Sequence, residues 1–80
     1  MKMPRDIGAK ELIKALNGFG YIVTRQIGSH IRLTLINAPN EFHVTIPDHN
    51  PIKIGTLNSI IKEVANQLSI SKAEIINKLV

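Results

Sequence analysis

The sequence predicts an α+β domain built as a two-layer sandwich, in which helices cover one face of a three-stranded antiparallel sheet. Two observations predict this class. Stretches with helical or strand-like patterns follow one another in the order helix, strand, strand, strand, helix, short helix. One face of the expected sheet is apolar and each expected helix has one apolar stripe, so a single core between two layers buries them together.

Size and composition limit the functions that the chain can have. Its 80 residues predict one domain over residues 1–80, and the absence of cysteine favours a reducing compartment, the cytoplasm, and excludes thiolate-ligated metal sites. No apolar run approaches the ~20 residues that cross a bilayer, so we predict no membrane partner. Ten Lys and Arg against six Asp and Glu give a formal charge of +4, which favours an anionic partner such as nucleic acid or an acidic protein.

Apolar periodicity predicts three helices. The stretch "GAKELIKALNGFG" has apolar residues at i, i+3, i+4 and i+7 and predicts a helix that ends near Gly18 to Gly20. The stretch "GTLNSIIKEVANQL" predicts a second helix, with Thr56 as its N-cap. In "SKAEIINKLV", Ser71 stands three residues before Glu74, and this capping box predicts a short third helix.

The stretches "YIVTRQI", "IRLTLI" and "EFHVTIP" predict strands that are joined by turns at "GS" and "NAPN". If "NAPN" closes a four-residue loop, the paired residues on one face are all apolar: Ile31 with Ile46, Leu33 with Val44, and Leu35 with Phe42. This agreement supports the register. The opposite, open face then carries polar side chains: His30, Arg32 and Thr34 beside Thr45 and His43.

The first hairpin places two cations together on this polar face. A two-residue loop at "GS" pairs Ile27 with His30 and therefore Arg25 with Arg32. Like charges that lie opposite one another destabilise a sheet, so the arrangement favours a phosphate or a carboxylate bound across them. The alternative is that the side chains of Arg25 and Arg32 both extend away from each other into water and bind no anion.

Histidine is the residue type with the clearest potential for chemistry in this sequence. His30, His43 and His49 invite a metal interpretation, but their spacing matches no known ligand pattern, and we predict neither a metal nor a cofactor. Proton transfer suits His30 better, because an unperturbed histidine pKa of ~6.5 allows it to act as base or acid near neutral pH. His43 is expected to be merely solvated.

Histidine beside phosphate-binding cations points to RNA cleavage. His30 would take the proton from a ribose 2′-hydroxyl, and this oxygen would then attack the adjacent phosphate. Arg25, Arg32 or Lys53 would stabilise the developing charge. The second proton-transfer group stays open between His49 as an accessory residue, Lys53 and water. The alternative for His30 is that it has no chemical role and is simply a polar residue that the sheet tolerates beside a turn.

Two segments carry a family resemblance. The stretches "GFGYIVTRQIGSH" and "VTIPDHNPIKIGTLNSIIKEV", in this order, resemble the HicA family of bacterial toxins, also called YcfA-like mRNA interferases, and cover roughly Ala9 to Leu68. The resemblance implies a double-stranded-RNA-binding-domain-like fold of order αβββα and a ribonuclease that cleaves mRNA to arrest translation. It also implies a HicB-type antitoxin that covers the active site, and His30 as the catalytic residue in a turn shaped by Gly28 and Ser29.

Two other classes of function fit the same residues. A non-catalytic RNA-binding module would use the basic sheet face with His30 as one more contact, so that His30→Ala would weaken binding modestly. A protein-interaction domain would use this face to recognise an acidic partner. Turnover of RNA distinguishes the nuclease from the RNA-binding module. RNA binding in the absence of the protein partner distinguishes either of these from the protein-interaction domain.

Overall fold

The computed structural model describes residues 3–37 and 39–80, and its elements follow the predicted order. The elements are α1 (Ala9–Asn17), β1 (Ile22–Ile27), β2 (His30–Asn37), β3 (Asn40–Pro47), α2 (Ile54–Leu68) and α3 (Lys72–Leu79). The strands form one antiparallel sheet in the order β1-β2-β3. The predicted α+β class and the antiparallel three-stranded sheet are confirmed.

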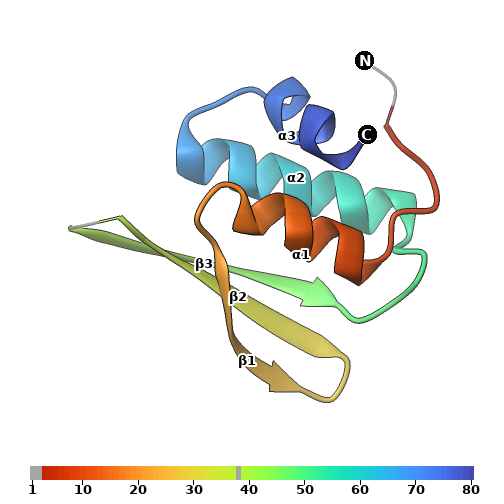
Figure 1. Ribbon diagram of the computed structural model, residues 1–80, viewed down its shortest axis with the longest axis horizontal. Helices are drawn as coiled ribbons and strands as arrows, with labels where there is room; N and C mark the ends of the chain where they lie inside the picture. The colour runs from red at the N-terminus through yellow and green to blue at the C-terminus, as the bar shows by residue number, and fades with distance from the viewer. Residues whose placement is uncertain (1–2, 38) are drawn as a thin grey trace.

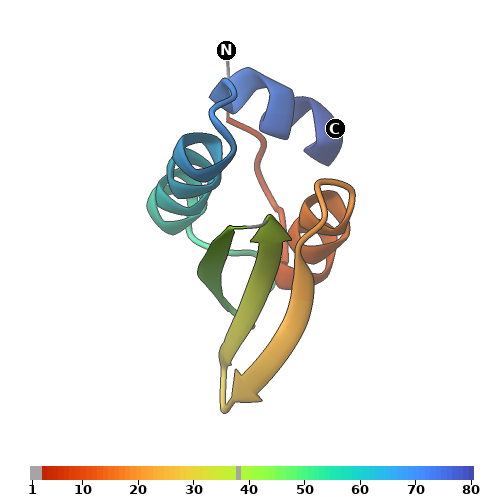
Figure 2. The same ribbon diagram turned by 90° about the vertical axis from the view of Figure 1, so that its left-hand side faces the viewer.

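The helices lie on one side of the sheet and leave its other face open (Figure 1). Helix α1 contacts β1, α2 contacts β3, and α3 packs against both α1 and α2. Seen from the side, α3 lies on the far side of α1 and α2 from the strands, and the turn between β1 and β2 reaches beyond the helices (Figure 2). All six residues of β1 are exposed, which fits this projecting hairpin.

The core lies between the apolar sheet face and the helices. Its most deeply buried side chains come from the sheet and from all three helices: Leu12, Leu16, Leu33, Ile46, Leu57, Ile61, Val64 and Ile75. The predicted pairs between β2 and β3 are all present, and the ladder continues to Asn37 and Asn40. The "NAPN" stretch therefore contributes strand residues at both ends, and Ala38 lies outside the described residues.

The two predicted helix caps differ in outcome. The Ser71 capping box is confirmed, because the Ser71 hydroxyl accepts a hydrogen bond from the Glu74 amide and the Glu74 carboxylate accepts one from the Ser71 amide. The prediction of Thr56 as an N-cap is wrong. Helix α2 begins at Ile54, and the Lys53 carbonyl accepts the first helical hydrogen bond, from Leu57. Thr56 therefore lies inside the first turn of α2, where its side chain has no free N–H groups ahead of it to cap.

Tyr21 is a core residue to which the sequence assigned no role. Its side chain is 0% exposed, and its hydroxyl donates to the Gln67 side-chain carbonyl at 2.5 Å. The side-chain amide nitrogen of Gln67 in turn donates to the main-chain carbonyl of His43 at 2.9 Å. Burial, with a smaller effect of the nearby Glu63 carboxylate, raises the pKa of Tyr21 from 10.0 to about 12. The phenol is therefore a neutral donor that connects the residue before β1 to α2, and Gln67 in turn connects α2 to β3.

Tyr21→Phe should lower the free energy of unfolding by about 1 kcal/mol at pH 7, because Gln67 loses its buried donor. The wild type should lose stability as the pH rises from 10 to about 12, since the unfolded phenol ionises at its ordinary pKa while the folded phenol keeps its proton. Tyr21→Phe has no phenol to ionise, so the difference in free energy of unfolding between the two proteins should become smaller between pH 10 and pH 12. Urea unfolding at pH 7, 10 and 12 measures this difference. A difference that stays constant would contradict the raised pKa of Tyr21.

Candidate active site

The predicted two-residue turn is present, and it places His30 at the first position of β2. Gly28 has a φ of 58°, and a positive φ at the first of two turn residues is what a type II′ hairpin requires of glycine. The turn is held from outside as well. The side-chain amide of Gln26 donates to the Gly28 carbonyl at 3.2 Å, and the Asp48 main-chain N–H donates to the Ser29 carbonyl at 2.7 Å.

The predicted pair of opposed arginines is also present, with Arg25 directly across from Arg32. His30 lies two residues before Arg32 on the same strand, so the two side chains share the open face. These three residues line one shallow hollow of about 400 Å³ together with Ile27 and Thr45. Within residues 3–37 and 39–80, neither arginine forms an ion pair. The hollow therefore combines a histidine with two cations that no carboxylate neutralises.

A β-bulge shapes this side of the hollow. Thr24 has no partner in β2, because Val23 pairs with Leu33 and Arg25 already pairs with Arg32. The hydroxyl of Thr24 shares a hydrogen bond of 2.8 Å with that of Thr34 on the open face. Two successive side chains, Thr24 and Arg25, therefore face the same side of the sheet, which a regular strand does not allow. The run of three polar residues in "TRQ" is the only sequence signal for it.

His43 is bound into the structure rather than merely solvated. Its Nδ1 lies 3.0 Å from the hydroxyl of Thr34, and its Nε2 lies 3.4 Å from the Glu41 carboxylate. Thr34 is only 4% exposed although it belongs to the polar face. The sequence places His43 on this face near Thr34, and the strand period of two also puts Glu41 on the same face. The structure adds the contact between the carboxylate and the ring.

A second hollow of about 460 Å³ lies between the outer edge of β3 and α2. Its lining residues come from all of β2, β3 and α2: Arg32, His43, Val44, Thr45, Thr56, Ser59, Ile60 and Glu63. Arg32 and Thr45 also line the hollow of His30. The sequence did not indicate this second hollow, because its two walls lie far apart along the chain and meet only where α2 packs beside β3.

The other candidate residues stand apart from both hollows. Lys53 and His49 are exposed and line neither of them. The main-chain carbonyl of His49 accepts a hydrogen bond from Ala9 at 3.0 Å, so its position serves the packing of α1. Among the described residues, no three His, Asp or Glu side chains come together in a way that could hold a metal ion. Over the same residues, no helix has the length and apolar character to span a bilayer.

Comparison with known proteins identifies the family. A model of the family described as "HicA toxin of bacterial toxin-antitoxin" matches residues 9–65, which run from the start of α1 into α2 and include the whole sheet with His30. Searches of the curated proteins and of the solved structures gave no match to the chain. Because the family match covers well over half of the sequence, this chain belongs to the HicA family of bacterial toxin-antitoxin toxins.

Proposed function

We propose that this toxin is a metal-independent endoribonuclease that cleaves messenger RNA in the cytoplasm, with His30 as its general acid-base. The observation that supports the proposal is the hollow on the open sheet face, which His30 shares with Arg25 and Arg32. Its opposed arginines carry positive charge that the sheet itself does not need and that a phosphate would neutralise. Membership of the HicA toxin family supports the same conclusion.

The proposed reaction uses three side chains of the hollow and a water molecule. His30 takes the proton of a ribose 2′-hydroxyl, the 2′-oxygen attacks the adjacent phosphorus, and the bond from phosphorus to the 5′-oxygen breaks. The guanidinium groups of Arg25 and Arg32 stabilise the added negative charge on the phosphoryl oxygens. We assign the proton for the leaving oxygen to water, because His49 and Lys53 line neither hollow.

The same face suits a protein partner, and we propose that a HicB-type antitoxin covers it. Ile22, Ile27 and Ile36 are 57%, 59% and 72% exposed, and the register places all three on the side of His30. Large apolar side chains that stay exposed together mark interaction surfaces. An antitoxin that buries them would close the hollow between the arginines.

Purified toxin incubated with a long mRNA in excess EDTA tests the proposal. We expect fragments that end in a 2′,3′-cyclic phosphate, because the 2′-oxygen is the nucleophile, or in the 3′-phosphate that forms when water opens this ring. An equimolar amount of the antitoxin should stop the cleavage. Cleavage that requires a divalent cation would contradict the metal-independent route. A folded, antitoxin-free toxin that binds the mRNA without cutting it would favour the RNA-binding module instead.

A further inference from the structure

The two hollows adjoin one another on the sheet, and together they make what we call the groove. Arg32 and Thr45 line both, so the hollow of His30 continues over β3 to the wall formed by α2. Only the first hollow takes part in the reaction proposed above. The second is of similar volume, about 460 Å³, and its lining residues include three that carry hydroxyls, Thr45, Thr56 and Ser59, together with Glu63. Any strand of RNA held at the arginines has this part of the groove next to it.

The distribution of charge along the groove separates its two ends. Arg25 and Arg32 both line the end at His30, whereas the second hollow combines Arg32 with Glu63 of α2. A phosphate is therefore attracted more strongly to the first end than to the second. The hydroxyls and the carboxylate of the second end are hydrogen-bonding groups that suit the edge of a nucleobase.

The edge of β3 adds main-chain groups to this wall. The His43 carbonyl points away from β2, because it accepts a hydrogen bond from Gln67 of α2. In an antiparallel strand, the N–H and C=O of one residue point toward the same edge of the strand, and the N–H and C=O of the residue two positions later point toward that edge as well. Thr45 therefore directs its N–H and C=O toward the groove. In the described part of the chain, no main-chain hydrogen bond from a loop or helix occupies them.

We propose that the hollow between β3 and α2 is a nucleobase subsite, which holds the base next to the phosphate bound at Arg25 and Arg32. Glu63 accepts a hydrogen bond from the exocyclic amino group of that base, because a carboxylate can only accept. Adenine and cytosine carry such a group and uracil does not. His43 forms part of the wall and is held in place by Thr34 and Glu41. The proposal rests on RNA as the substrate, which is part of the proposed function.

Binding of short RNA to a cleavage-deficient toxin tests the subsite. The His30→Ala protein should bind hexanucleotides of adenylate and of cytidylate about five-fold more tightly than hexauridylate, as measured by fluorescence anisotropy. Adding Glu63→Gln should reduce this preference to less than about two-fold, because an amide side chain can turn to donate or to accept. Glu11→Gln removes the same charge from the exposed face of α1 and should leave the preference unchanged.

The outcomes separate this inference from the proposed function. A preference that survives Glu63→Gln, that disappears equally in Glu11→Gln, or that is absent in the His30→Ala protein itself overturns the subsite, whether or not the wild type cleaves RNA. If the preference behaves as expected and the wild type still does not cleave RNA, the nuclease is wrong and the subsite stands. Glu63 is exposed, so Glu63→Gln should keep the fold, and circular dichroism of each variant checks this.

Discussion

His30→Ala should slow RNA cleavage by about a hundred-fold or more, because it removes the general base that activates the 2′-hydroxyl. The fold should be unaffected, since the His30 side chain is exposed at the first position of β2. RNA binding should weaken only slightly, because Arg25 and Arg32 remain. The rate of cleavage is measured in single-turnover reactions with excess EDTA, beside thermal unfolding of both proteins.

Imidazole separates proton transfer from a contact role in this experiment. Added at tens of millimolar, it should restore part of the cleavage by the His30→Ala toxin, because the hollow is open to solvent and can admit the free base. It should leave the wild-type rate unchanged. Cleavage by His30→Ala at the wild-type rate would show that His30 is not the base. A loss that imidazole does not restore, together with an equal loss of RNA binding, would assign His30 to binding.

Arg32→Gln should slow cleavage by about a hundred-fold, because the guanidinium stabilises charge that develops on the phosphoryl group. It should also reduce the dependence of RNA affinity on salt by about one counterion. The expected effect on stability has the opposite sign. Removing one of two cations that lie opposite each other should leave the free energy of unfolding unchanged or raise it by about 0.5 kcal/mol. A gain in stability beside a loss of activity is what a binding site, rather than a structural role, produces.

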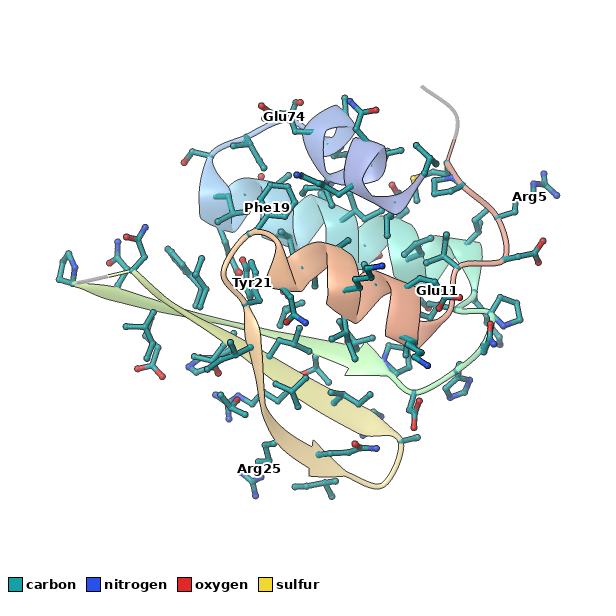
Figure 3. All side chains as sticks on the ribbon, in the orientation of Figure 1. Arg5, Glu11, Phe19, Tyr21, Arg25 and Glu74 are labelled. Carbon is teal, nitrogen blue, oxygen red and sulfur yellow. The ribbon has the colours of Figure 1, made fainter. Side chains whose placement is uncertain are left out.

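Arg5→Gln is the matched control for this prediction. It removes the same charge and leaves the same side chain, but Arg5 lies in the segment before α1, beside the helices and well away from Arg25 (Figure 3). We expect near wild-type cleavage from Arg5→Gln. If both variants lose cleavage equally, the effect comes from net charge, and the opposed arginines have no specific part in it.

The register of the sheet could be predicted because its side-chain period is two. A shift of one residue would have moved Leu33 and Val44 to the solvent, so only one register pairs apolar residues throughout. The same register, together with a two-residue turn, determined that Arg25 lies across from Arg32 and that His30 begins the returning strand. The core of the candidate site therefore follows from local rules.

Other features depend on contacts between segments that are distant in sequence. Tyr21 meets Gln67 only after α2 has packed beside β3, and a strand pattern contains no information about that meeting. The bulge at Thr24 is stabilised by a hydroxyl of the neighbouring strand. The start of α2 differs from the prediction by one turn, and Ile52, two residues before the helix, is buried in the core. A cap preference of about 1 kcal/mol is smaller than the free energy of burying such a side chain, so a cap signal alone is a weak guide to where a helix starts.

The sequence by itself determined the class of fold, the pairing of the strands, and the placement of a histidine beside two opposed arginines on an open face. Each of these depends on periodicity and turn chemistry over a few residues. Only the tertiary structure decided that the hollow of His30 continues as a groove to Glu63, and that Lys53 and His49 lie outside it. The physical reason is that a groove is the space between two elements. Its shape and charge depend on how closely α2 packs against the edge of β3, and that packing is set by the core as a whole.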